Sequence, residues 1–339
     1  MTPAIKKKDL CPCGSGKEYE DCCMETKNQR EDDSLTESSE PVEEIWIDID
    51  ESEDIFFSEY LESPPEELWN PTKVASMTTE EIIEKLKLMN VHFDEDQFLH
   101  QAQDYHSACY LADDHYYTQD WKSEKDEDFI WMAIHELWKR FIPHQLSAEM
   151  IDEVIFNGYE FYYSGEYGNS CSEWKKVWKM IKKIIPSDIT DATAIPKSIP
   201  ISNDLIEWAT FYCEVLGLEG LEDNSFLYER ITFVREFIKK FPDDDSFCQY
   251  LLLMEYESYA LLKKIKKAEH LFQSFIKKYP KNPTAYVLWG TMYWEYNDNP
   301  DYEKALKIYR RGLSQCTHNK KIILDQLKKV KEQKKLISK

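Results

Sequence analysis

The chain has 339 residues, of which 42% are hydrophobic and 14% aromatic, so it can form a substantial core in two domains or in one elongated domain. Only 9 residues are glycine, which favours helices, because glycine costs about 1 kcal/mol in a helix interior. The net charge of −22 argues against a general nucleic-acid or anionic-membrane binder, since such ligands repel an acidic surface.

The first predicted element is a cysteine cluster at the N-terminus. Cys11, Cys13, Cys22 and Cys23 form two close pairs separated by eight residues. Zinc binds four tetrahedral ligands, with sulfur at about 2.3 Å, and the segment Gly14-Ser15-Gly16 permits the turn that would bring the pairs together. So small a module cannot bury a core, which predicts one structural Zn²⁺ as the basis of its fold. Two disulfides or free thiols are the alternative.

The remaining five cysteines are scattered singly along the chain. An odd total without a disulfide framework indicates a reducing cytoplasm. The basic N-terminus runs into Cys11 without the apolar stretch of a secretory signal. No run approaches the roughly 18 apolar residues of a membrane span, so we expect a cytoplasmic protein.

The cysteine pattern, Cys-x-Cys-Gly-Ser-Gly-Lys-x-Tyr-x-x-Cys-Cys, resembles the SEC-C motif, best known from the C-terminal tail of the preprotein translocase motor ATPase. The resemblance covers fewer than 30 residues and implies zinc ligation by the four cysteines of this zinc knuckle (residues 1–27). It points to protein export or translation, with a second protein partner or the ribosome at the knuckle. Related motifs are lysine-rich after the glycines, which suits acidic partners. This chain instead has Glu18, Glu20 and Asp21, which argues against an acidic partner at its knuckle.

Residues 28–70 have the composition of a disordered, self-repelling acidic linker. Sixteen Asp and Glu residues, and no Lys or Arg, lie between Glu31 and Glu67. Its apolar residues, such as those of Ile45–Asp50, would either pack loosely on the next domain or form a linear motif that docks in a groove. A regulatory arm that covers the groove or the basic Lys320–Lys339 segment is a further hypothesis.

The pattern is helical from Thr78 onward. Thr78 has the properties of an N-cap, and further helices are expected over Asp94–His115 and Glu127–Ile142. Four helical segments share an ending in which basic residues are followed by proline, a standard stop signal; the prolines are Pro143, Pro186, Pro242 and Pro280. We therefore expect a helical domain over 71–200 and helical repeats with a basic capping helix over 201–339.

The repeats resemble tetratricopeptide (TPR) units. The best unit contains Trp289, Gly290, Tyr293, Ala305 and Tyr309, and the unit before it contains Tyr259, Ala268, Phe272 and Pro280. The predicted fold is all-α: a TPR-like α-solenoid of helix pairs, with an ordinary helical bundle as the alternative. By TPR geometry, the concave face in the last unit would be lined by Thr284, Val287, Thr291 and Trp294, whereas Tyr286, Trp289 and Tyr293 would pack between helices.

Candidate chemistry outside the knuckle is weak. Five residues invite interpretation as a metal-dependent hydrolase, but their spacing does not place them on one helical face; they are His100, His106, Asp113, Asp114 and His115. The stretch 169–172 (Asn-Ser-Cys-Ser) is expected to be a helix–helix connection with Ser172 as cap, with a loop that holds a nucleophile as the alternative.

We therefore expect a zinc-binding adaptor rather than an enzyme. It would recruit one protein partner at the knuckle and bind a protein or peptide in the groove of the repeats. Nucleic acid is an unlikely ligand. A metal-dependent enzyme with its active site in 71–200 is the alternative.

Overall fold

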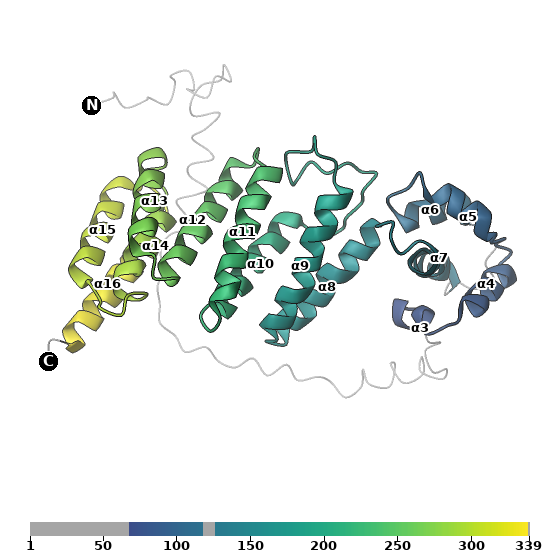
Figure 1. Cartoon of the computed structure of the whole chain (residues 1–339), viewed down its shortest axis with the longest axis horizontal. Helices are drawn as coiled ribbons and strands as arrows, with labels where there is room; N and C mark the ends of the chain where they lie inside the picture. Colours follow the sequence, from purple (N-terminus) through teal and green to yellow (C-terminus); the bar gives the residue numbers. More distant parts are fainter. Residues whose placement is uncertain (1–67, 118–125, 338–339) are drawn as a thin grey trace, which may run out of the picture. The chain divides into compact units, whose positions relative to one another are not determined.

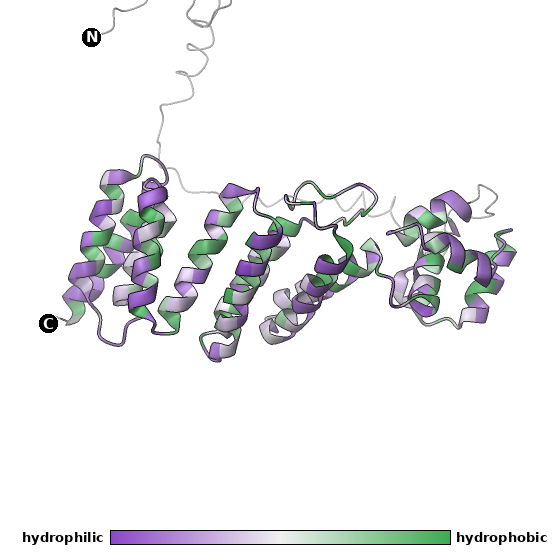
Figure 2. Cartoon of the chain, turned by 45° about the horizontal axis from the view of Figure 1, so that its top comes forward, coloured by the Kyte–Doolittle hydropathy of each residue, from purple (hydrophilic) through white to green (hydrophobic). Residues whose placement is uncertain are grey.

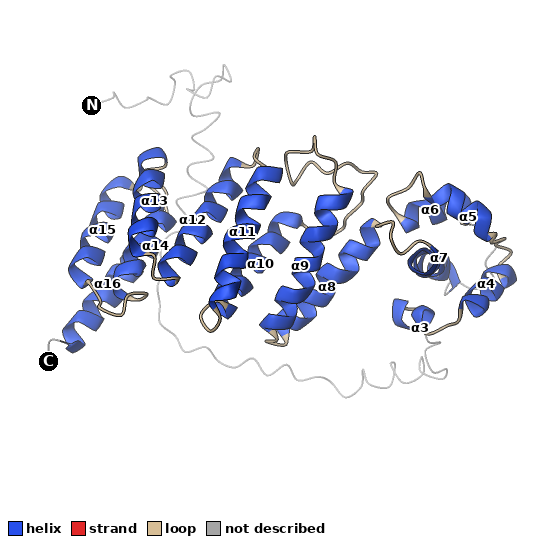
Figure 3. Ribbon diagram, viewed as in Figure 1, coloured by secondary structure: helices blue, strands red, loops and turns tan. Residues whose placement is uncertain are grey.

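The computed structural model describes residues 68–117 and 126–337, and the zinc knuckle and residues 28–67 of the acidic linker lie outside these ranges. Contacts divide the chain into residues 1–66 and 67–339, and the description below concerns the second unit. Every regular element in the described ranges is a helix and no strand occurs there, which confirms the all-α prediction (Figures 1 and 3). The helices are α3 (Pro71–Ala75), α4 (Thr79–Leu88), α5 (Glu95–Ala102), α6 (Ala108–His115), α7 (Glu127–Phe141), α8 (Ala148–Tyr163), α9 (Tyr167–Ile184), α10 (Leu205–Glu219), α11 (Asn224–Lys240), α12 (Asp245–Leu261), α13 (Ile265–Lys278), α14 (Pro283–Trp294), α15 (Tyr302–Gln315) and α16 (Lys320–Ile337).

The helices α3 to α7 surround a first hydrophobic core, which runs from Val74 to Ile142. Helix α7 is central to it, because α3, α4 and α6 all pack against α7. Trp138 of α7 is fully buried and meets the ring of Phe98 edge to face. This apolar face explains why the predicted helix over 127–142 forms as expected.

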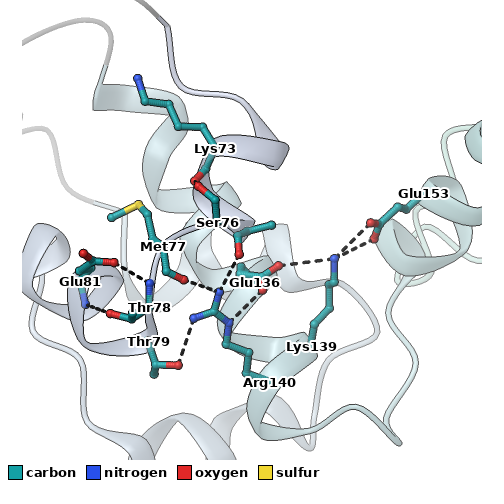
Figure 4. A network of polar contacts seen from close by, with 11 residues as sticks. Lys73, Ser76, Met77, Thr78, Thr79, Glu81, Glu136, Lys139, Arg140 and Glu153 are labelled. Atoms are coloured by element: carbon teal, nitrogen blue, oxygen red, sulfur yellow. Dashed lines mark hydrogen bonds and ion pairs between the residues drawn. The ribbon is translucent and has the colours of Figure 1, made fainter.

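A polar network closes this first core at the end of α7 (Figure 4). The guanidinium of Arg140 donates to the backbone carbonyls of Ala75 (3.2 Å), the last residue of α3, and of Met77 (2.8 Å), just after it. It also donates to the Thr79 hydroxyl at 3.1 Å and to Glu136 at 2.9 Å. Carbonyls at the end of a short helix would otherwise lack partners, so Arg140 satisfies them and joins the α3–α4 connection to α7.

The single helix expected over Asp94–His115 is wrong, because the structure contains two helices, α5 and α6, in that range. The break is stabilised by Ser107, which caps α6 by accepting a hydrogen bond from the Tyr110 amide at 3.0 Å. The predicted cap at Thr78 is confirmed. Its hydroxyl accepts from the Glu81 amide, and the Glu81 carboxylate accepts from the Thr78 amide, as in a capping box.

Glu149, in the first turn of α8, also serves the start of α6. Its carboxylate accepts hydrogen bonds from the Ser107 hydroxyl at 2.5 Å and from the amides of Ala108 (3.0 Å) and Cys109 (3.1 Å). Burial raises the pKa of Glu149, but the hydrogen bonds from Ser107 and the amides outweigh it and the pKa is lowered overall. The carboxylate is therefore held ionised between two helix N-termini, where negative charge is favourable.

An ion pair joins α7 to α8 (Figure 4). The Lys139 ammonium donates to both carboxylate oxygens of Glu153, at 3.1 and 3.2 Å. The hydrogen bond from His135 and that from Lys139 lower the pKa of Glu153 to about 2. The pair thus links the first core to the helices that follow.

The helices α8 to α16 form a stack of helix pairs with a second, larger core, from Ile151 to Val330. Each helix packs on the next in the chain, and α10, α12, α14 and α16 also pack on one another in succession (Figure 1). We call α8, α10, α12, α14 and α16 the A helices and α9, α11, α13 and α15 the B helices. Contacts between successive A helices, in addition to contacts within each pair, define a TPR-like α-solenoid. This core crosses the boundary expected at residue 200.

The proline stop signals mark the ends of three B helices, as expected. Helices α9, α11 and α13 each end two residues before the proline, with lysines in the last turn. The remaining signal ends α7 of the first core. A proline disfavours helical geometry in the residue before it, so the recurrence reflects a real repeat in three of its four occurrences.

Helix α14 is enclosed by its neighbours α12, α13, α15 and α16. It has no charged residue, whereas α13 and α15 carry hydrophilic residues along one side (Figure 2). Gly290 permits close approach of α15, because a Cβ atom there would lie 2.1 Å from the Tyr309 ring. Tyr286, Trp289 and Tyr293 are at most 5% exposed and pack between helices, as predicted.

Candidate peptide-binding groove

A cavity of about 350 Å³ lies on the A-helix side of the stack. Its walls come from α10, from α12 and from the residues that follow α14, and one side chain reaches it from α11. We call this cavity the A-helix groove. It is lined by Glu214, Gly217, Leu218, Leu221, Arg230, Tyr250, Met254, Glu257, Leu261, Glu295 and Tyr296.

Arg230 is the buried cation of the groove. The residue is only 3% exposed, and its Nη1 donates to the Glu257 carboxylate at 3.0 Å, while Nη2 donates to Met254 Sδ at 2.8 Å. Gly217 of α10 makes room for it, because a Cβ atom at that position would lie 2.9 Å from Nη1. Nε has no hydrogen-bond partner among the residues that the structure describes. Nε is therefore a buried donor nitrogen without a partner in that part of the chain.

Glu257 is shared between this arginine and a tyrosine. Its second carboxylate oxygen accepts a hydrogen bond from the Tyr296 hydroxyl at 2.8 Å. Burial and the nearby Glu257 charge raise the pKa of Tyr296, so the phenol keeps its proton at neutral pH. This arrangement connects α11, α12 and the segment after α14 through one carboxylate, which fixes the shape of the groove floor.

The rim of the groove is acidic and apolar. Glu214 and Glu295 are exposed carboxylates. Leu218 is 39% exposed and Leu221 is 64% exposed, whereas other leucines of the stack, such as Leu216 and Leu251, are fully buried. A ligand with positive charge and apolar side chains would complement both features.

None of the four residues predicted to contact a partner lines this groove. Thr291 is 5% exposed, and its hydroxyl bonds to that of Tyr309 at 3.0 Å; the Trp294 indole N–H donates to the same hydroxyl at 3.0 Å. Val287 is partly buried against the core. Thr284 lines a different cavity, near the start of α14. Their role in partner binding stays a prediction.

The groove residues of α12 were missed in the sequence, although a signal exists. Tyr250, Met254, Glu257 and Leu261 follow one another at intervals of four, three and four residues, which places them on one helical face. The TPR register was used to predict concave-face residues in α14 alone. The same register applied one repeat of about 34 residues earlier would have placed Tyr250 and Glu257 on the concave side.

The candidate hydrolase residues of the first core mostly bond to protein groups. Asp113 accepts from the Trp131 indole at 2.6 Å, and Asp114 accepts from the Tyr105 hydroxyl at 2.6 Å. His115 bonds to the Gln101 side chain at 2.9 Å. In the described part of the chain, no group of three or more His, Cys, Asp and Glu side chains is arranged to hold a metal ion.

Cys109 of α6 and Cys171 of α9 are also poor nucleophiles. Burial and then Glu149 raise the pKa of Cys109 to about 12, and burial with Glu219 and Glu229 raises that of Cys171 to about 12. The prediction that residues 169–172 connect two helices is wrong, because they lie inside α9. Ser172 is therefore an interior helical residue and not a cap.

Three comparisons bear on the class of the protein. Residues 8–25 match the SEC-C motif. No curated protein matches the chain. Among solved structures, the crystal structure of the P58(IPK) TPR domain matches over 72% of this chain and 67% of that chain, with 15% sequence identity and a TM-score of 0.27. So low a TM-score carries no argument, and the fold rests on the helix contacts themselves.

The motif and the fold together define a class: a helical-repeat protein with TPR-like pairs and an N-terminal SEC-C motif. Such a stack belongs to the folds that bind proteins and peptides. No helix in the described ranges is both long and apolar enough to cross a membrane. The cysteines of the motif lie outside the described residues, so zinc binding stays a prediction.

Proposed function

We propose that this chain is a cytoplasmic protein-interaction adaptor whose A-helix groove binds a peptide segment that carries both basic and apolar residues. The observation that supports it best is the groove itself, with a buried guanidinium on its floor and carboxylates on its rim. Basic side chains would pair with Glu214 and Glu295, and apolar ones would cover Leu218 and Leu221.

A titration with two synthetic peptides tests the groove. The first is a short peptide that alternates lysine and leucine, and the second has glutamate in place of lysine. The second peptide should not bind in the groove, and we expect fluorescence anisotropy to show groove binding of the first peptide only. The double variant Glu214→Lys, Glu295→Lys should weaken it by about tenfold or more, since each charge at the rim becomes repulsive.

The matched control is the double variant Glu84→Lys, Glu160→Lys, which makes the same change in net charge at two exposed glutamates outside the groove. It should bind the lysine–leucine peptide with only a small loss of affinity, the loss that the change in net charge alone causes. Equal losses in the two double variants would show that the acidic surface as a whole, and not the groove, attracts the peptide, and would refute the proposal.

The second part of the proposal is that the zinc knuckle recruits another protein or the ribosome, in export or translation. Four thiolates suit one structural Zn²⁺, to be held by Cys11, Cys13, Cys22 and Cys23. Purified protein should contain one zinc per chain by elemental analysis under reducing conditions. The variants Cys11→Ser and Cys22→Ser should lose it, whereas Cys109→Ser should keep it. Retained zinc in the first two would contradict this ligand set, whatever the groove binds.

A further inference from the structure

Helix α16 is an A helix that has no B helix after it in the described chain. It packs on α14 and α15 through residues such as Ile323 and Val330, which are fully buried. Its other sides carry exposed apolar residues: Ile322 is 40% exposed, Leu324 50% and Leu336 66%. In a TPR-like array a B helix covers part of this surface, and no described helix follows α16 to do so.

The charge of α16 is opposite to that of the whole chain. The helix contains seven lysines against one aspartate and one glutamate, whereas the chain has a net charge of −22. Most of these lysines are exposed. Helix α15 adds Lys304, Lys307, Arg310 and Arg311 against a single acidic residue, Glu303. The end of the stack is thus a cationic face on an acidic protein.

A cavity of about 680 Å³ lies between α15 and α16 on this face. Leu306 and Leu336 supply its apolar surface, and Arg310, Lys331 and Lys335 are among its charged lining. Lys334, which also lines it, forms an ion pair with Glu303. We call this cavity and its lining residues the cap face. Lysine side chains have long apolar stems below their charge, so the site offers both apolar contacts and positively charged groups.

We propose that the cap face binds an acidic peptide segment of a partner protein in which aspartate or glutamate residues are interspersed with apolar ones. Carboxylates would pair with Arg310, Lys331 and Lys335, while apolar side chains would contact Leu306 and Leu336. This site differs from the A-helix groove in its place and in the sign of its charge. It is also independent of the proposed function, since the groove selects a basic ligand.

The composition of the cap face favours a peptide over a nucleic acid. Helix α16 has no aromatic residue on which a base could stack. Glu303 and Glu332 line the same cavity and would repel a continuous phosphate backbone, whereas a peptide can place a neutral residue opposite each of them. The exposed apolar surface at Leu336 adds a contact that phosphates do not need.

A labelled synthetic peptide with the sequence of residues 43–57 is a suitable probe, because it contains seven acidic residues among isoleucine, tryptophan and phenylalanine. Anisotropy titrations use the full chain and a variant that lacks residues 31–66, so that the chain's own acidic residues do not compete. We expect binding at low salt that weakens as salt screens the charges. A probe with serine in place of its apolar residues should bind less tightly.

The double variant Lys331→Gln, Lys335→Gln should reduce the affinity about fivefold or more. The matched control is Lys266→Gln, Lys277→Gln, which removes two exposed lysines of α13 and should have no effect beyond that of net charge. Leu336→Ala should also weaken binding, whereas Leu324→Ala, outside the cavity lining, should not. Circular dichroism should show unchanged helix content in all four.

Two results would overturn the proposal. One is the absence of peptide binding in both the full chain and the variant without residues 31–66. The other is a single-stranded RNA of similar length that binds more tightly than the peptide and loses affinity in Lys331→Gln, Lys335→Gln, which would identify the cap face as a phosphate-binding surface.

Discussion

The A-helix groove and the cap face arrange their charges in opposite ways. In the groove the cation is inside: the Arg230 side chain is 4% exposed and pairs with Glu257, while carboxylates stand at the rim. At the cap face the cations are outside, and even the paired Lys334 and Glu303 side chains are 44% and 68% exposed. A buried pair is held in one geometry, whereas exposed lysine side chains sample many conformations. The groove can therefore select a ligand by shape, and the cap face by charge and apolar content.

The largest expected effect concerns the buried pair. Glu257→Gln would leave the Arg230 guanidinium buried without a counter-ion, and we expect the free energy of unfolding to fall by about 3 kcal/mol. Urea denaturation followed by circular dichroism measures it. The double variant Arg230→Met, Glu257→Met should recover most of the loss, because replacing a buried pair by apolar residues is often neutral. A double variant no more stable than Glu257→Gln would show that packing, and not charge, is responsible.

A smaller effect is expected at Gly217, where a Cβ atom would lie 2.9 Å from Nη1 of Arg230. Gly217→Ala should displace the guanidinium and reduce the affinity for the lysine–leucine peptide about tenfold, which is about 1.4 kcal/mol. Unfolding should change by less than about 1 kcal/mol, since alanine favours the helix. The control is Gly168→Ala in α9, whose Cβ would meet only the Glu219 carboxylate at 3.4 Å. Unaltered binding in Gly217→Ala would mean that the guanidinium position is unimportant for the groove.

The smallest effect is expected at the exposed pair of the cap face. Lys334→Gln removes the ion pair with Glu303, but both side chains are well exposed to water. Solvent-exposed pairs contribute little to stability, so the urea midpoint should match that of the wild type within error. A loss as large as that of Glu257→Gln would remove the distinction drawn between the two sites.

The ends of the helices could be predicted from the sequence because their signals are local. Lysines in a last turn followed by Pro186, Pro242 or Pro280 act within a few residues, and Thr78 with Glu81 forms a capping box within four. The break before α6 depends instead on Ser107 and on Glu149, which lies about forty residues away. No local pattern contains that partner, so the two short helices were expected as one.

The groove was less predictable than the fold for the same reason. That Arg230 would be buried follows from contacts across 27 residues to Glu257 and from the nearby Gly217, which are tertiary facts. The stripe of Tyr250, Glu257 and Leu261 was visible as helical spacing, but spacing alone does not separate a core face from a groove face. The four knuckle cysteines show the reverse case, since their chemistry is local and their motif is matched at residues 8–25.

The carboxylate of Glu149 has a consequence for how the chain is made. It belongs to the first helix of the stack, yet it completes the start of α6 in the preceding core. A nascent chain that has emerged only as far as residue 143 therefore lacks the group that satisfies the Ala108 and Cys109 amides. We therefore expect these two amides to gain their partner only once α8 has left the ribosome, and a proteolytic cut between α7 and α8 should weaken the start of α6. The two cores are thus packed separately, but a residue of α8 completes the start of α6.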